Sequence, residues 1–178
     1  MVTQVLSTER LELRRSQPED AAVIAAYRND PEVRRHQGWG QTTAEEVRAA
    51  IEEMLPREPG VEDWVQFSVF ERSSGHLVGD VGLSPSRSEP AVIKIGYTID
   101  PAHQGRGYGT EAVRALVDFI FATLDPPVVR MYADADNIPS IRLAEKVGMR
   151  HMETFEEVDE EGPWKGVRYE IRRADEER

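Results

Sequence analysis

The chain contains no cysteine among its 178 residues, which excludes disulfides, thiolate metal ligands and a cysteine nucleophile. It also lacks any apolar run close to the roughly 20 residues that a membrane-spanning helix needs. No Gly-x-Ser-x-Gly motif is present, so the nucleophile signature of the serine hydrolases is missing. None of the four histidines lies at the spacing of a metal-binding pair. These absences favour a globular protein with no metal and no membrane association.

Basic residues are outnumbered, with 22 Lys and Arg against 33 Asp and Glu, and the net charge is −11. Such a surface repels phosphate backbones, so direct nucleic-acid binding is not expected. The acidic excess has two explanations that the sequence leaves open, namely solubility or the attraction of a cationic substrate such as an amine. The first residues lack the charged start and long apolar stretch of a signal peptide, so we expect a cytoplasmic location.

Hydrophobic periodicity predicts one α/β (α+β) domain over residues 1–178, with a mostly antiparallel, twisted sheet. Apolar runs predict seven strands, at residues 9–14, 64–71, 77–83, 93–99, 128–133, 149–159 and 164–172. Apolar residues at helical spacing predict four helices, at residues 18–28, 43–54, 110–121 and 140–147.

The most informative segment is the glycine loop, which we define as residues 104–110. A β-branched strand leads into it, glycines stand at positions 105, 107 and 109, and an amphipathic helix begins at Thr110. Glycine lets backbone approach a ligand closely, and a helix start presents free N–H groups and a positive dipole end. The pattern therefore predicts an anion site and favours a pyrophosphate. A Walker A lysine is missing after Gly109, and Thr110 replaces the third glycine of a dinucleotide fingerprint.

The pattern Gln104-x-x-Gly107-x-Gly109 resembles the acetyl-CoA pyrophosphate loop of the GCN5-related N-acetyltransferases (GNAT). Other segments are similar to the ribosomal-protein alanine acetyltransferase branch of that superfamily, the RimJ- and RimL-like proteins. They are distributed over nearly the whole chain, at residues 8–14, 29–33, 77–83, 137–149 and 162–169. The resemblance implies a GNAT-type domain with a mixed sheet of about seven strands and about four flanking helices.

The resemblance also implies an activity, which is direct transfer of acetyl from acetyl-CoA to a primary amine. The acceptor would be a protein N-terminus, an aminoglycoside-like molecule or a metabolite, and acetyl-CoA would be a cosubstrate. Backbone N–H groups of the glycine loop would hold the pyrophosphate, and the preceding strand would pair with the pantetheine arm. The implied cofactor-binding residues are Tyr97, Thr98, Ile99, Gln104, Gly105, Arg106, Gly107, Tyr108, Gly109, Thr110, Asn137 and Ser140.

Catalysis requires the amine to lose a proton and the departing thiolate to gain one. Ser140 is the candidate proton donor, although its small hydroxyl equally suits a helix cap. Tyr97 is a second candidate donor. The base is unassigned, because Lys94 stands where many relatives carry a glutamate. Asp80, Glu153 or water are the alternatives for that role.

The acceptor pocket is expected around residues 34–39, where this branch places part of it. Trp39 and Trp64 are candidates to line the pocket and Asp80 is a candidate polar contact, although both tryptophans also suit a core. The main alternative function is a non-catalytic acyl-CoA-binding or sensor module, which the lysine at position 94 favours. An enzyme that uses a different acyl-CoA is another alternative. Edge strands of such sheets can pair between subunits, so a homodimer is also considered.

Overall fold

The computed structural model describes residues 5–37, 40–89, 91–159 and 162–173. Its strands are β1 (Val5–Ser7), β2 (Leu11–Arg15), β3 (Val65–Glu71), β4 (Leu77–Pro85), β5 (Val92–Ile99), β6 (Val128–Asp134), β7 (Arg150–Asp159) and β8 (Gly162–Arg172). The helices are α1 (Ala21–Arg28), α2 (Pro31–Arg34), α3 (Ala44–Met54), α4 (Tyr108–Thr123) and α5 (Ile138–Val147), with short 3-10 helices η1 (Pro18–Asp20) and η2 (Pro101–His103).

Within the described residues, the strands form one eight-stranded sheet in the order β1-β2-β3-β4-β5-β6-β8-β7. Only β5 and β6 run parallel among these neighbours, and the other pairs are antiparallel. The expected mixed, mostly antiparallel α/β fold is therefore confirmed. None of the helices in this part of the chain has the length and apolar character that crossing a membrane would take.

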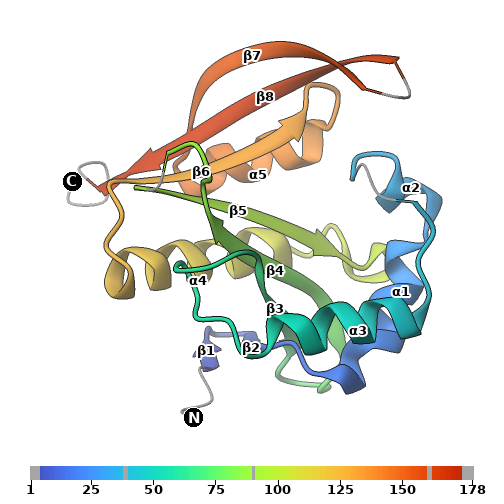
Figure 1. Cartoon of the computed structure of the whole chain (residues 1–178). Helices are drawn as coiled ribbons and strands as arrows, with labels where there is room; N and C mark the ends of the chain where they lie inside the picture. Colours follow the sequence, from blue (N-terminus) through green and yellow to red (C-terminus); the bar gives the residue numbers. More distant parts are fainter. Residues whose placement is uncertain (1–4, 38–39, 90, 160–161, 174–178) are drawn as a thin grey trace.

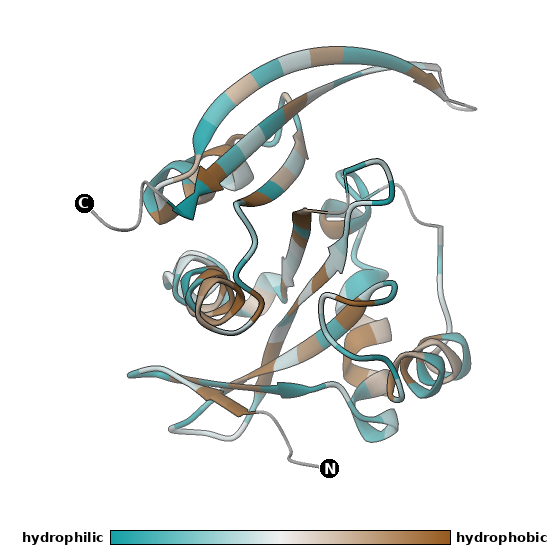
Figure 2. Cartoon of the chain, turned by 60° about the vertical axis from the view of Figure 1, so that its left-hand side comes forward, coloured by the Kyte–Doolittle hydropathy of each residue, from teal (hydrophilic) through white to brown (hydrophobic). Residues whose placement is uncertain are grey.

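Helices cover both faces of the sheet, with α4 on one face and α1 and α3 on the other (Figure 1). Successive side chains of β3 point to opposite faces of the sheet, so they pack alternately toward α4 and toward α1 and α3. Phe67 packs edge-on against Phe119 of α4, with ring centroids 6.2 Å apart. Phe70 packs instead with the cluster of α1 and α3. In Figure 2 the hydrophobic residues lie mainly on the strands and on the helix sides turned toward them.

Strands β5 and β6 diverge, and this opening positions the site (Figure 1). Their pairing ends at Ile95 and Met131, whereas β5 stays paired with β4 as far as Ile99. The backbone N–H of Asp100 donates to the Val78 carbonyl at 3.0 Å. Hydrogen bonding alternates along an antiparallel pair, so the even-numbered residues of β5 bond to β4. The backbone groups at positions 97 and 99 consequently face the opening.

Candidate active site

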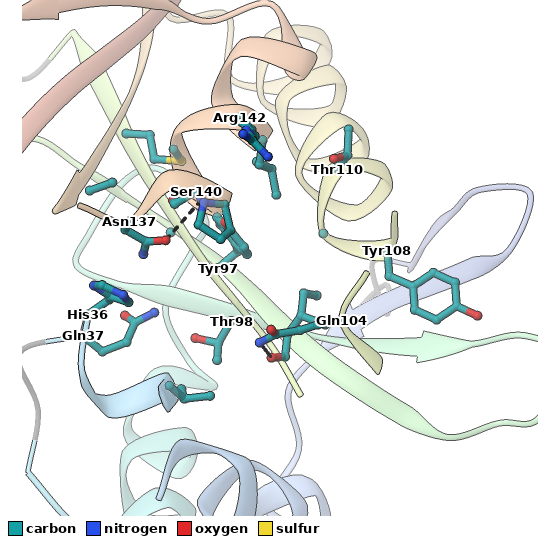
Figure 3. Close-up of a pocket in the computed structure, with 18 of the residues that line it drawn as sticks. His36, Gln37, Tyr97, Thr98, Gln104, Tyr108, Thr110, Asn137, Ser140 and Arg142 are labelled. Carbon is teal, nitrogen blue, oxygen red and sulfur yellow. Dashed lines mark hydrogen bonds between the residues drawn. The ribbon is translucent and has the colours of Figure 1, made fainter. Parts of the chain in front are cut away.

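A cavity of about 650 Å³ lies where β5 and β6 diverge, between the glycine loop, α5 and α2 (Figure 3). It brings together residues that lie between positions 32 and 146 of the chain. Eleven of the twelve cofactor-binding residues expected from the sequence lie on its wall, namely Tyr97, Thr98, Ile99, Gln104, Gly105, Gly107, Tyr108, Gly109, Thr110, Asn137 and Ser140. Their assignment as ligand contacts stays a prediction.

The three glycines of the loop meet different structural requirements. Gly105 and Gly107 have φ angles of 74° and 82°, in the left-handed region that favours glycine. Gly109 lies in the first turn of α4, where an added Cβ would come within 2.9 Å of Leu143 Cδ1 and 3.3 Å of Ile99 Cγ1. The first two glycines therefore let the chain turn into the helix, and the third lets α4 approach β5 and α5.

Two polar contacts hold the loop at the end of β5. Gln104 Nε2 donates to the Ile99 carbonyl at 2.9 Å, so this side chain bonds to the exposed edge of β5 (Figure 3). The Asp100 side chain accepts a hydrogen bond from Ala102 N at 3.0 Å and thereby caps η2. The loop is positioned by the protein itself, which reduces the cost of ordering it around a ligand.

Arg106 is the one expected cofactor-binding residue that is not on the cavity wall. Its carbonyl oxygen accepts a hydrogen bond from Arg10 Nη1 at 2.9 Å. Arg10 also pairs with Glu111 of α4, with 2.6 Å between Nη2 and Oε2. Tyr108 touches the wall, but its ring points away from the other labelled residues in Figure 3, and its hydroxyl donates to Glu71. That hydrogen bond raises the pKa of Tyr108.

Asn137 caps α5, Ser140 lies in its first turn, and both residues line the cavity. Asn137 Oδ1 accepts a hydrogen bond from the backbone N–H of Ser140 at 3.2 Å, which is the N-cap of the helix (Figure 3). The Ser140 hydroxyl takes no part in this bond. It lies beside Tyr97, whose pKa is raised by burial and lowered to a smaller extent by the Ser140 side chain. The Asn137 side chain is therefore the cap of α5, and the Ser140 hydroxyl, which also suited that role, does not serve as the cap acceptor.

Sequence reasoning missed two basic residues of α5, Arg142 and Lys146, that also line the cavity. They stand four positions apart and therefore share one face of the helix. In a chain of net charge −11 they supply positive charge beside the glycine loop. Their spacing within the expected helix was the signal that could have identified them.

His36 follows α2 and lies on the cavity wall. Its Nδ1 is 3.0 Å from Asp134 Oδ2 and 3.6 Å from Asp136 Oδ1. The ligand-type atoms of these three residues lie within 4.8 Å of one another. Asp136 is also 66% exposed and pairs with Arg35 at 3.4 Å, so a cation already competes for that carboxylate. The expectation that no metal binds here stays a prediction.

Trp64 and Asp80 do not lie on the wall of this cavity. The Trp64 indole covers Gly82 and Gly96, which face each other across β4 and β5, and a Cβ at these glycines would meet the ring at 2.2 and 3.1 Å. Asp80 is 3% exposed and accepts hydrogen bonds from Tyr27 and Arg28. These contacts favour packing roles. Trp39 lies outside the described residues.

The other candidates for the base also lie away from the cavity wall. Glu153 pairs with Arg168 of β8, with 3.4 Å between Oε1 and Nη1. Lys94 pairs in register with Ser84 and Arg130, where β5 is still bonded to both of its neighbours. The geometry therefore does not bring Asp80, Glu153 or Lys94 to the cavity.

Comparisons with known proteins agree with this geometry. A family model described as an acetyltransferase (GNAT) domain matches residues 10–150. The uncharacterized N-acetyltransferase p20 of Bacillus licheniformis is 30% identical over 142 residues, which are 79% of this chain and 79% of p20.

Solved structures show the same fold. A GNAT-family acetyltransferase from Bacillus anthracis has a TM-score of 0.85 at 23% identity and covers 97% of this chain and 99% of its own. RimL, a ribosomal L7/L12 alpha-N-protein acetyltransferase solved in complex with coenzyme A, has a TM-score of 0.83 at 15% identity, with coverage of 95% and 98%. The chain therefore belongs to the GNAT acetyltransferase family and is an acyl-CoA-dependent N-acetyltransferase.

Proposed function

We propose that this protein transfers the acetyl group of acetyl-CoA to the primary amine of a cationic acceptor. One observation carries the proposal: a single cavity joins the glycine loop, the open edge of β5 and the capped start of α5. The glycine loop suits a pyrophosphate, the open edge of β5 suits an extended amide-bearing arm, and the start of α5 suits a thioester. The three groups follow one another in this order in acetyl-CoA.

The residues present suit acetyl-CoA. The N–H groups of the glycine loop and the first turn of α4 are available to an anion, and positive φ at Gly105 and Gly107 turns the backbone into that arrangement. The backbone groups of Tyr97 and the N–H of Ile99 at the open edge of β5 suit an added strand, which is how the amides of pantetheine would pair, while the Ile99 carbonyl is bonded to Gln104. Arg142 and Lys146 suit the remaining phosphate charge.

The chemistry follows from the thioester end of the cavity. A neutral amine attacks the carbonyl carbon, the carbon–sulfur bond breaks, and the thiolate takes up a proton. Ser140 and Tyr97 present hydroxyl groups there, and the raised pKa of Tyr97 keeps its phenol protonated at neutral pH. The amide of Asn137 is fixed by its cap and adds a polar group to the same wall.

Charge supports a cationic acceptor. Glu32 lines the cavity, and Asp134 and Asp136 stand beside it around His36. These carboxylates are part of the acidic excess that gives the chain a net charge of −11, and they concentrate cations near the opening. A protein N-terminus with nearby basic residues, an aminoglycoside and a polyamine all share this chemistry, so the three acceptor classes are tested together.

The proposal is tested by measuring thiol release from acetyl-CoA with a panel of basic peptides, aminoglycosides and polyamines. We expect turnover with at least one class, and we expect Gly107→Glu to raise the KM for acetyl-CoA at least about tenfold, because a side chain at a φ of 82° strains the loop and its Cβ would lie 3.3 Å from Arg10 Nη2. Gly75→Glu is the matched control, since Gly75 has a similar φ of 72° but lies off the cavity wall.

Binding of coenzyme A without turnover across this panel would contradict the proposal and favour a non-catalytic module. Turnover with succinyl-CoA at an equal or higher kcat/KM would contradict the choice of acyl group alone.

A further inference from the structure

His36 occupies a distinctive place at the thioester end of the cavity. Its partner Asp134 ends β6, and the short segment after Asp134 leads through Asn137 into α5, whose first turn carries Ser140. The imidazole is therefore docked on the same segment that positions the candidate proton donor. Figure 3 shows His36 next to Asn137, with Tyr97 and Ser140 on the neighbouring wall.

The contact with Asp134 orients the imidazole. A carboxylate 3.0 Å from Nδ1 accepts the proton of that nitrogen and fixes the tautomer with a lone pair on Nε2. Within the part of the chain that the structure describes, no protein group bonds to Nε2. The side chain is 19% exposed, so it is held in place and still reaches solvent.

We infer that His36 is the general base that removes the proton from the acceptor amine, with Asp134 as its positioning residue. This inference rests on the proposed function. It fills the role that Lys94 leaves open, because His36 is a proton acceptor on the cavity wall and its partner Asp134 leads into the segment that carries Ser140, whereas Lys94, Asp80 and Glu153 lie off that wall. Glu32 and His103 also line the cavity, but His103 pairs with Asp100 next to the glycine loop.

The proton balance is complete without another reactant. The acceptor arrives as an ammonium ion and gives one proton to His36 Nε2, directly or through one water. The free amine then forms the nitrogen–carbon bond and the carbon–sulfur bond breaks. The proton that the bonded nitrogen must lose goes to water, and the thiolate takes one from the hydroxyl of Ser140 or Tyr97. Water returns a proton to that hydroxyl and His36 releases its proton to solvent, so each turnover releases one proton overall.

Four charged groups surround His36 and set its electrostatic environment. Asp134, the last residue of β6, and Asp136 in the following segment lie 3.0 and 3.6 Å from its Nδ1. Arg35 precedes it and pairs with Asp136, and Glu32 of α2 lines the same cavity. The three carboxylates favour the approach of an ammonium ion, so these charges serve substrate capture.

The test compares His36→Gln with Gln37→Ala, a change at the neighbouring residue on the same wall. We expect His36→Gln to lower kcat/KM for the amine about 100-fold and to remove the acidic limb of its pH profile. The affinity for acetyl-CoA, measured by titration calorimetry, should change less than about twofold. Gln37→Ala should keep the acidic limb.

Asp134→Asn should lower kcat less than His36→Gln does and should shift the acidic limb of the pH profile. Added imidazole should partly restore the activity of His36→Ala.

An active wild type together with an unchanged kcat/KM and pH profile in His36→Gln would overturn this inference and leave the proposed function intact. A wild type that acetylates no amine would contradict both. Loss of wild-type activity on chelation, restored by Zn²⁺, would also overturn the inference, because His36, Asp134 and Asp136 would then hold a metal ion and not a proton.

Discussion

At the residue scale, Ser140 contributes two groups to two different tasks. Its backbone N–H completes the cap of α5, and its hydroxyl faces the cavity beside Tyr97. Because Ser140→Ala removes only the hydroxyl, the cap bond to Asn137 Oδ1 remains. We expect kcat to fall about tenfold or more while the affinity for acetyl-CoA changes little. Steady-state kinetics and calorimetry measure the two quantities separately.

Tyr97→Phe is the companion variant for Ser140→Ala, since it removes the neighbouring hydroxyl from the same wall. If Ser140→Ala keeps the wild-type kcat and Tyr97→Phe loses it, the tyrosine is the donor. Equal loss of acetyl-CoA affinity and kcat in Ser140→Ala would show that its hydroxyl only binds the cofactor.

At the element scale, the pairing of β4 with β5 depends on Gly79. A Cβ at this position would lie 2.3 Å from the Thr98 carbonyl oxygen and 3.0 Å from Ile99 Cα, which are backbone atoms that move only with the strand. We expect Gly79→Ala to lower the free energy of unfolding by about 1–3 kcal/mol and to weaken acetyl-CoA binding. Urea denaturation and calorimetry measure these effects.

Gly40→Ala is the control for that experiment, because nothing lies within 4 Å of its added Cβ. We expect it to change the free energy of unfolding by less than about 0.5 kcal/mol. A Gly79→Ala protein as stable as the wild type would show that the close approach of the two strands is not required.

The start of α4 is tied to the β1–β2 connection by Glu111, and this contact depends on pH. Burial raises the pKa of Glu111, but hydrogen bonds from Thr8 and Arg10 outweigh that effect and hold it below its ordinary value. The stabilisation is therefore complete above the pKa of an unfolded glutamate, about 4.3, and is lost as pH falls through the lower folded-state pKa. We expect Glu111→Gln to destabilise the protein at pH 7 and to reduce its loss of stability on acidification.

Urea denaturation at pH 7 and at about pH 4 measures this difference, with Glu52→Gln on the exposed face of α3 as the charge-matched control. An identical decrease in stability on acidification in Glu111→Gln and the wild type would contradict the role of this carboxylate.

Most elements were predictable because their signals are local. The capping box of Thr43 and Glu46 begins α3 where a helix was predicted from residue 43, and the glycine loop leads from η2 into the first turn of α4. Among the strands and α-helices of the described residues, two short elements were missed. β1 has only three residues, too few for an alternating pattern, and α2 has four, although Asp30 caps it and Pro31 begins it.

The candidate site was predictable only where it is contiguous in sequence. His36 and Asp134 are 98 positions apart, and no periodicity connects them. Trp64 was expected at the acceptor pocket, but two facing glycines create space for its ring over β4 and β5, a pairing that depends on strand register. Register and the divergence of β5 from β6 are tertiary features, so single-sequence patterns cannot supply them.

At the scale of the whole molecule, the net charge of −11 predicts a salt dependence. Raising ionic strength from about 0.05 to 0.5 M shortens the Debye length from roughly 14 to 4 Å and screens the attraction of a cationic acceptor. We expect kcat/KM for a polyamine to fall several-fold more than kcat/KM for a monoamine. Initial rates over a salt series test this, and parallel curves for the two acceptors would contradict a field effect.

The central claim is that an acetyl group reaches an amine at this cavity, and product mass tests it most directly. Mass spectrometry of an acceptor incubated with acetyl-CoA should show the addition of one acetyl group per reacting amine with the wild-type protein. The Gly107→Glu protein should show little or none, and the Gly75→Glu control should match the wild type. Release of coenzyme A with the amine left unmodified, or equal acetylation by the wild type and Gly107→Glu, would contradict the account.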